Sequence, residues 1–272
     1  MDPLALVPYA IAAAGGRTNG FDSSQLVAAG LTLLQRSAPL VRALAGRRSA
    51  LLLPPGPAWL VGLAASDGRG AVLLEPNSAI QEARLREWNV GAVFTTRALQ
   101  ASLPPGTPYV LLDDAPRHAR VVSADRVQEL DLGSHFALDL IGDTEGRGSP
   151  EECVLFASTG LSASHEQLMD AARRAMRAEQ FTPVDRTVTV VSPHALDSVA
   201  RAAPAPLLAG GQLRTVAEHT TTALLDAVDE IDATMIVLPS ALGDALRDAL
   251  GLPGWVHADP LARVKRVVRV TI

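Results

Sequence analysis

The stretch CVLFASTGLSASHEQL, residues 153–168, joins a short apolar run, a loop of small residues and the start of a helix. The run Cys153–Ala157 predicts a buried strand. Ser164, with Gln167 three residues later, has the pattern of a capping box and predicts a helix over Glu166–Gln180. A strand that leads through a small hydroxylated loop to a helix N-terminus presents backbone N–H groups, so this stretch is a candidate anion-binding site.

Similar apolar runs recur along the rest of the chain and alternate with helical patterns. Short runs rich in branched residues predict strands that are buried on both faces. Their alternation with helices predicts an α/β fold of mainly parallel sheets flanked by helices. The other predicted strands are Ser49–Leu53, Ala71–Leu74, Ala92–Thr95, Tyr109–Leu112, Thr187–Val191, Thr234–Leu238 and Val264–Val270. The other predicted helices are Ser24–Ala45, Ala58–Ser66, Ile80–Trp88, Thr221–Glu230 and Ser240–Leu250.

Two segments bear on how the chain is organised. The stretch IGDTEGRGSPEE, residues 141–152, is polar and glycine-rich, which predicts a linker. We therefore expect a first α/β subdomain over residues 1–145 and a second, which carries the loop, over residues 146–272. The apolar N-terminus, MDPLALVPYAIAAAGG, is either a helix packed on the core or a docking segment for a partner or a membrane surface. It has no basic n-region and carries Asp2, so a secretory signal is not expected.

The composition excludes several classes of protein. Of the 272 residues, 48% are hydrophobic and 19% are charged, which allows a sizeable core and excludes disorder over the whole length. The net charge is −5 and there is no basic block, so we expect no nucleic-acid partner. A single cysteine, Cys153, cannot build a disulfide framework or a thiolate zinc site. No apolar run reaches the ~18–20 residues of a membrane span. We therefore expect a cytoplasmic protein with no transmembrane segment of its own.

The order and spacing of these segments resemble the adenylate-forming superfamily, which includes acyl- and aryl-CoA synthetases, luciferases and the adenylation domains of peptide synthetases. The phosphate loop of that family is rich in Ser, Thr and Gly and follows an apolar strand. The resemblance implies that Ser158, Thr159, Gly160 and Ser162 form the corresponding nucleotide-binding loop. Residues 48–77, 86–96, 185–213 and 224–246 also resemble family segments, so the chain is expected to have the fold of the family's N-terminal subdomains.

The loop differs from the family pattern at the position where the resemblance implies a positively charged lysine. Only Gly160 remains of the core glycines, and Ser164, His165 and Glu166 stand where the resemblance implies Pro-Lys. Histidine is mostly neutral at pH 7. A carboxylate in the first helical turn stabilises the helix, but it would repel a triphosphate. The one lysine, Lys265, lies in an apolar strand pattern and is no candidate for the catalytic lysine.

The chain matches roughly the first half of a family member. The resemblance therefore implies that the later segments, which hold the ribose and deliver the catalytic lysine, are missing from it.

The remaining polar candidates have structural interpretations. His194 lies near a family histidine that gates the acyl pocket, but the preceding aromatic residue is missing, so we interpret it as a loop histidine. Asp113 and Asp114 end a strand and are interpreted as turn or cap residues. No catalytic residue and no metal site are predicted. The other histidines show no metal-ligand spacing and are interpreted as surface or capping residues: His118, His135, His219 and His257.

The sequence favours a pseudoenzyme, that is, a non-catalytic structural or accessory subunit built on a degenerate AMP-binding scaffold, with no cofactor. Catalysis of adenylation needs oriented positive charge against the phosphates, and the loop lysine is missing. The partners would be protein subunits of a larger complex, which includes the option of a membrane complex reached through protein contacts. One alternative is an ATP-dependent acyl- or aryl-acid activating protein, similar to acyl-CoA ligases, that uses Mg-ATP and is completed by a partner chain. Another is a sensor that binds a nucleotide or acyl group without turnover.

Overall fold

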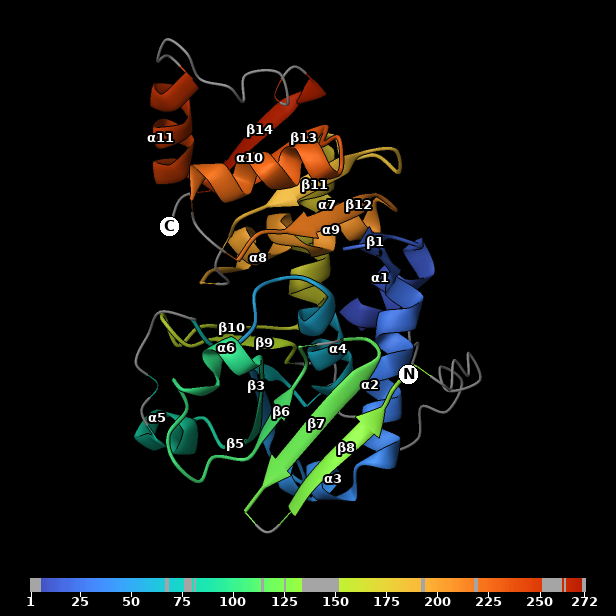
Figure 1. The fold of residues 1–272 in the computed structure, drawn as a ribbon, viewed down its shortest axis with the longest axis vertical. Coiled ribbons are helices and arrows are strands. Elements are labelled where there is room, and N and C mark those ends of the chain that lie inside the picture. Colours follow the sequence, from blue (N-terminus) through green and yellow to red (C-terminus); the bar gives the residue numbers. More distant parts are fainter. Residues whose placement is uncertain are drawn as a thin grey trace.

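The computed structural model describes residues 6–66, 69–75, 80, 82–113, 115–124, 126–133, 152–191, 194–217, 220–250, 261 and 263–270, with no side chains at 247–250. These residues form two β-sheets with helices between them and on both outer faces (Figure 1). The predicted α/β class with mainly parallel sheets is confirmed.

One sheet has eight strands: β3 (Arg48–Leu51), β4 (Ala71–Leu73), β5 (Val90–Thr95), β6 (Tyr109–Leu111), β7 (His118–Ser123), β8 (Arg126–Asp131), β9 (Val154–Phe156) and β10 (Ser162–Ala163). Their spatial order is β10-β9-β4-β3-β5-β6-β7-β8. The five strands from β9 to β6 are parallel, and the antiparallel strands β10, β7 and β8 lie at the two edges. All five strands predicted in this region are present.

The other sheet has six strands: β1 (Arg17–Thr18), β2 (Phe21–Asp22), β11 (Arg186–Thr189), β12 (Gln212–Thr215), β13 (Met235–Pro239) and β14 (Arg266–Val270). Their spatial order is β14-β13-β11-β12-β1-β2, and only the β1–β2 pair is antiparallel. The three strands predicted here correspond to β11, β13 and β14. All three are rich in the branched residues Val, Ile and Thr, which favour strands, so the sequence predicts their positions.

The helices form three layers. They are α1 (Val7–Ala14), α2 (Ser23–Arg36), α3 (Ala38–Ala43), α4 (Pro57–Ser66), α5 (Glu82–Glu87), α6 (Arg97–Gln100), α7 (His165–Glu179), α8 (Leu196–Ala202), α9 (Pro204–Leu208), α10 (Thr221–Glu230) and α11 (Ser240–Leu250). The largest apolar cluster joins both sheets through α1, α2, α4, α7, α8 and α9, which therefore form the central layer. Separate clusters attach α10 and α11 to the outer face of the six-stranded sheet, and α5 to the outer face of the other.

Two helical predictions are refined by the structure. The predicted helix Ser24–Ala45 is divided into α2 and α3, because Ser37 leaves the helical conformation and its side chain accepts a hydrogen bond from the Leu40 N–H. Pro39 then occupies the first turn of α3, where its missing N–H is tolerated. The N-terminal apolar segment forms α1, which buries Val7, Tyr9 and Ile11 and so agrees with the interpretation as a core helix.

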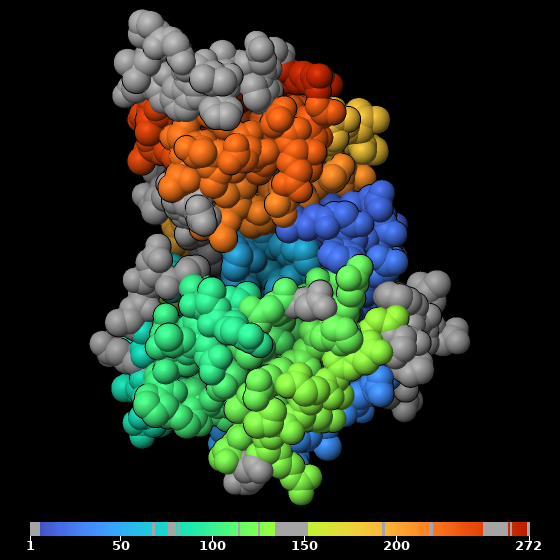
Figure 2. Space-filling view, viewed as in Figure 1, coloured from blue at the N-terminus to red at the C-terminus, as the bar shows by residue number. Residues whose placement is uncertain are grey.

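Segments from both halves of the chain cross between the sheets. Strands β1 and β2, near the N-terminus, complete the six-stranded sheet. In the eight-stranded sheet, β9 pairs with β4, and β10 pairs with β9 at the edge. Figure 2 shows the N-terminal helical region in blue between the orange and green parts of the surface. The predicted boundary at residues 145 and 146, and residues 141–151 of the predicted linker, lie outside the described residues. Within the described ranges, no helix is long and apolar enough to cross a membrane.

Candidate functional site

The predicted phosphate loop is the tip of a tight hairpin between β9 and β10. Leu155 and Val154 pair with Ser162 and Ala163, and the turn 157–161 projects from the edge of the sheet. Ser158, Thr159, Gly160 and Ser162 are all exposed and lie together in this hairpin. Gly160 has φ +70°, a left-handed conformation that glycine adopts without strain, and a Cβ there would meet no atom within 4 Å.

Most of the backbone N–H groups in this hairpin are already bonded within the protein. The Gly160 and Thr159 N–H groups both donate to the Phe156 carbonyl, at 2.8 and 3.3 Å. The Ala157 N–H donates to the Leu73 carbonyl at 3.1 Å, and the Leu161 N–H to Thr159 Oγ1 at 3.3 Å. These groups point into the turn or the sheet, whereas an anion cradle needs them directed outward.

The start of α7 is likewise satisfied by its own side chains. Ser164 Oγ accepts from the Gln167 N–H at 3.1 Å, and Gln167 Oε1 accepts from the Ser164 N–H at 2.8 Å. The predicted capping box is therefore confirmed. Glu166 adds an exposed carboxylate to the first turn. The positive end of the helix dipole thus faces a negative charge that the chain itself supplies.

His165 is the first residue of α7, and its side chain is buried instead of pointing into the solvent around the loop. Its side chain is 3% exposed, and Nδ1 accepts a hydrogen bond from the Val7 N–H at 3.1 Å. Burial lowers the pKa of His165 to about 4, so the imidazole is neutral at pH 7. Its role is to tie α1 to α7. Sequence reasoning missed this role, because the two residues lie 158 positions apart.

The one lysine of the chain, Lys265, lies at a different sheet from the loop. Lys265 is exposed just before β14, at an edge of the six-stranded sheet, whereas the loop belongs to the eight-stranded sheet. Its N–H donates to the Thr234 carbonyl at 2.8 Å, which continues the pairing with β13.

Among the described residues that the sequence singled out, His194 also lies beside the loop. The Ser158 hydroxyl donates to the His194 carbonyl at 3.4 Å, so the chain before α8 lies against the hairpin. The contact uses the backbone of His194, which agrees with a loop residue.

The remaining candidates lie elsewhere. Asp113 Oδ1 accepts from the Arg97 N–H at 2.8 Å and so caps α6, as interpreted from the sequence. His118 begins β7 and is exposed. Within the described ranges, no three His, Cys, Asp or Glu residues are placed to hold a metal ion. The candidates Asp114, His135, His219 and His257 lie outside the described residues.

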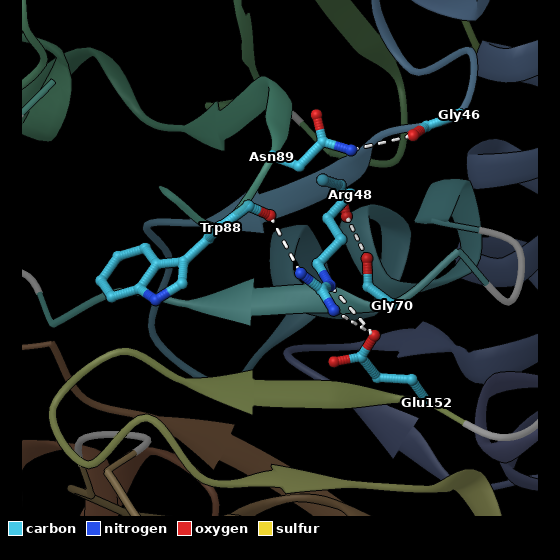
Figure 3. A network of polar contacts seen from close by, with 7 residues as sticks. Gly46, Arg48, Gly70, Trp88, Asn89 and Glu152 are labelled. Carbon is cyan, nitrogen blue, oxygen red and sulfur yellow. Dashed lines mark hydrogen bonds and ion pairs between the residues drawn. The ribbon is translucent and has the colours of Figure 1, made fainter. Parts of the chain in front are cut away.

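A polar network lies at the amino end of the parallel strands (Figure 3). The Arg48 guanidinium donates to Glu152 Oε2 at 2.8 and 3.0 Å and to the Trp88 carbonyl at 3.1 Å. Asn89 Nδ2 donates to the Gly46 carbonyl at 3.0 Å. Ligands in open parallel sheets bind at the carboxyl ends of the strands, so we assign this network a structural role.

Cys153, next to Glu152, is a buried thiol. Burial, with a smaller effect of the Glu152 charge, raises its pKa well above the usual range. The sulfur therefore stays protonated and is neither a nucleophile nor a metal ligand.

The fold is similar to that of several solved structures of adenylate-forming enzymes. No protein-family model matches the sequence, and no curated protein matches it. The nonribosomal peptide synthetase FmoA3, in its AMPPNP-bound form, matches 96% of this chain with a TM-score of 0.64 and 15% identity. ATP-bound MatB from Rhodopseudomonas palustris matches 92% with a TM-score of 0.61 and 18% identity. CmiS6 matches 97% with a TM-score of 0.64 and 17% identity.

The match covers only part of these proteins. This chain spans 28% of the FmoA3 chain, 49% of MatB and 65% of CmiS6. At such low identity the comparison concerns the fold, which matches over nearly all of this chain. The chain is therefore built on the α/β fold of the adenylate-forming enzymes.

Proposed function

We propose that this chain is a non-catalytic structural or accessory subunit of a larger protein assembly, which keeps the adenylate-forming scaffold without its nucleotide chemistry. The observation that carries the proposal is the internal bonding of the loop amides at residues 157, 159, 160 and 161. A triphosphate at the hairpin would have to compete with these bonds or find other donors.

The charges around the loop support the same proposal. Stabilising a transferring phosphoryl group requires preorganised positive charge aimed at its oxygens. Here the first turn of α7 carries Glu166, and the neutral His165 is turned toward α1. The described residues at the hairpin therefore do not fit Mg-ATP, and we derive no chemical step through it.

A second candidate is ATP-dependent activation of an acyl or aryl acid, with the missing charge supplied by a partner chain. Two observations favour it. The fold is similar to that of FmoA3 and MatB, which were solved with AMPPNP and ATP bound. The side chains of Ser158, Thr159 and Ser162, together with Gly160, are exposed in one hairpin. Binding without turnover would instead make the chain a nucleotide or acyl sensor.

ATP–pyrophosphate exchange separates these functions. The purified chain would be assayed with Mg-ATP and a panel of short, medium and aromatic carboxylic acids, with an ATP-binding ligase as positive control. We expect no acid-dependent exchange and no shift of the melting temperature with Mg-ATP. Exchange that depends on one acid would overturn the proposal in favour of the activating enzyme, and a saturable shift without exchange would favour the sensor.

The assembly role has its own test. The chain would be tagged at its native locus and purified under mild conditions, and the co-purifying proteins quantified by mass spectrometry. We expect at least one other protein at a fixed stoichiometric ratio. A chain that purifies alone would contradict the subunit role.

A further inference from the structure

A shallow apolar groove of about 360 Å³ runs between α1, α7 and α9. Its walls are Ala10, Ala13 and Ala14 of α1, Met169 and Met176 of α7, and Leu208 of α9. The alanines let another backbone approach closely, and methionine side chains adapt to irregular surfaces. Arg173 of α7 borders the groove.

A row of charged side chains follows the same side of α7. Glu166, Asp170, Arg173 and Arg177 are spaced by four, three and four residues, which places them on one face of the helix. All four are exposed. Among the described residues, Glu166 and Arg177 have no ion-pair partner, and Asp170 reaches Arg173 at 3.6 Å.

The charge order of this row is self-complementary. Two negative charges precede two positive charges, and both the 166/177 pair and the 170/173 pair are symmetric about the midpoint between Ala171 and Ala172. If a second α7 lies antiparallel across the first, each carboxylate faces a guanidinium of the other copy. A parallel arrangement would place like charges opposite one another, which is unfavourable.

We propose that a second copy of this chain docks in this groove, with the two α7 helices antiparallel about a two-fold axis. Glu166 then faces Arg177 of the second copy, and Asp170 faces Arg173 of the second copy. The groove walls of the two copies, which include Met169 and Met176, then face each other beside the charged rows. Such an interface is isologous, because the same patch serves both subunits.

The apolar groove and the charged row contribute differently to the dimer. Most of the binding free energy comes from removing the apolar groove from water, since exposed ion pairs contribute little net free energy. The charged rows fix the orientation and register of the two helices. The inference goes beyond the proposed function and does not depend on whether the hairpin binds a nucleotide.

Charge reversal tests the interface. Variant Glu166→Arg/Asp170→Arg has an all-positive row, and variant Arg173→Glu/Arg177→Glu has an all-negative row. In either homodimer every cross-pair becomes repulsive, so we expect the dimer dissociation constant to rise at least about tenfold. An equimolar mixture of the two variants restores opposite charges across the interface, so we expect it to form a heterodimer.

Sedimentation velocity of the full chain, at concentrations up to about 100 µM, is the measurement. The control Arg84→Glu/Arg86→Glu reverses two exposed charges on α5 and should leave the dimer unchanged. Circular dichroism and thermal melting show whether each variant is folded. Ala13→Glu changes an exposed residue that lines the groove, so we expect it to weaken the dimer independently of the charged rows.

A wild-type chain that is monomeric at the highest concentration overturns this inference, and so do charge-reversed variants that stay monomeric when mixed. If the chain is a monomer and shows no acid-dependent ATP–pyrophosphate exchange, only the dimer is overturned, and the proposed function is retained. A charge-dependent dimer that activates an acid overturns only the proposed function.

Discussion

His165 stands at the start of α7, where the resemblance implies a charged residue, but its environment keeps it neutral. It is buried at the start of α7 and receives a hydrogen bond from the Val7 N–H at 3.1 Å. A proton on Nδ1 would place two N–H groups against each other, and burial already disfavours the charged ring. The neutral imidazole is therefore part of the folded core.

The lowered pKa of His165 predicts acid sensitivity. The unfolded chain takes up a proton near pH 6.5, whereas the folded chain does so only near pH 4. The free energy of unfolding therefore keeps the contribution of this group above pH 6.5 and loses it as the pH falls toward 4. At pH 5 the free energy of unfolding is lower by about 2 kcal/mol than at pH 7.5. Urea unfolding at pH 7.5 and pH 5 measures this loss.

His165→Asn should remove most of this acid-dependent loss, because asparagine does not titrate and can still accept a hydrogen bond. His118→Asn, which changes an exposed histidine on β7, serves as the control and should leave the loss intact. An unchanged pH dependence in His165→Asn would contradict the assignment.

At the scale of elements, α2 and α4 pack with their backbones in close approach. A Cβ at Gly30 of α2 would lie 2.5 Å from the Val61 carbonyl oxygen and 2.8 Å from the Ala64 Cβ of α4. Glycine is required here to avoid backbone contact, because both helices are fixed in the central layer.

Gly30→Ala should therefore destabilise the fold by about 1–3 kcal/mol, although alanine favours a helix elsewhere. Gln35→Ala, on the exposed side of the same helix, should stay within about 0.5 kcal/mol of the wild type. Urea denaturation of both variants makes the comparison. Equal stability of Gly30→Ala and the wild type would show that the helices can move apart freely.

The elements differ in how well the sequence predicts them. Buried parallel strands are continuous apolar runs, so β3, β5 and β13 were predicted within about two residues at each end. The β7–β8 hairpin was missed, because these edge strands contain no apolar run longer than two residues. Strands β1, β2 and β10 have two residues each, too few for a pattern.

The candidate site shows a similar division. The sequence correctly predicts a hydroxylated turn and a capped helix at residues 158–167, because both depend on neighbouring residues. The inward bonding of the turn amides to Phe156 and Leu73, and the tie from His165 to Val7, depend on contacts that only the folded chain creates.

At the scale of the whole molecule, the two sheets share segments from both halves of the chain. β9 pairs with β4 of the first half, and β1 pairs with β12 of the second. The central apolar cluster also spans both sheets. The two halves therefore complete each other's sheets and core.

This exchange predicts that fragments 1–145 and 146–272 do not fold alone. Each lacks strands and core helices that the other supplies, so we expect poor NMR chemical-shift dispersion and no cooperative unfolding for either fragment. Mixing the two should restore a native-like spectrum. A folded spectrum from either isolated fragment would show that the predicted subdomains are independent.

This molecule has the fold of the adenylate-forming enzymes, and we propose that its hairpin holds no triphosphate site. Isothermal titration calorimetry of the full chain with Mg-ATP tests this proposal. We predict no saturable heat with a dissociation constant below about 1 mM. Saturable Mg-ATP binding below that value, abolished by Thr159→Asp at the exposed hairpin tip, would contradict the account.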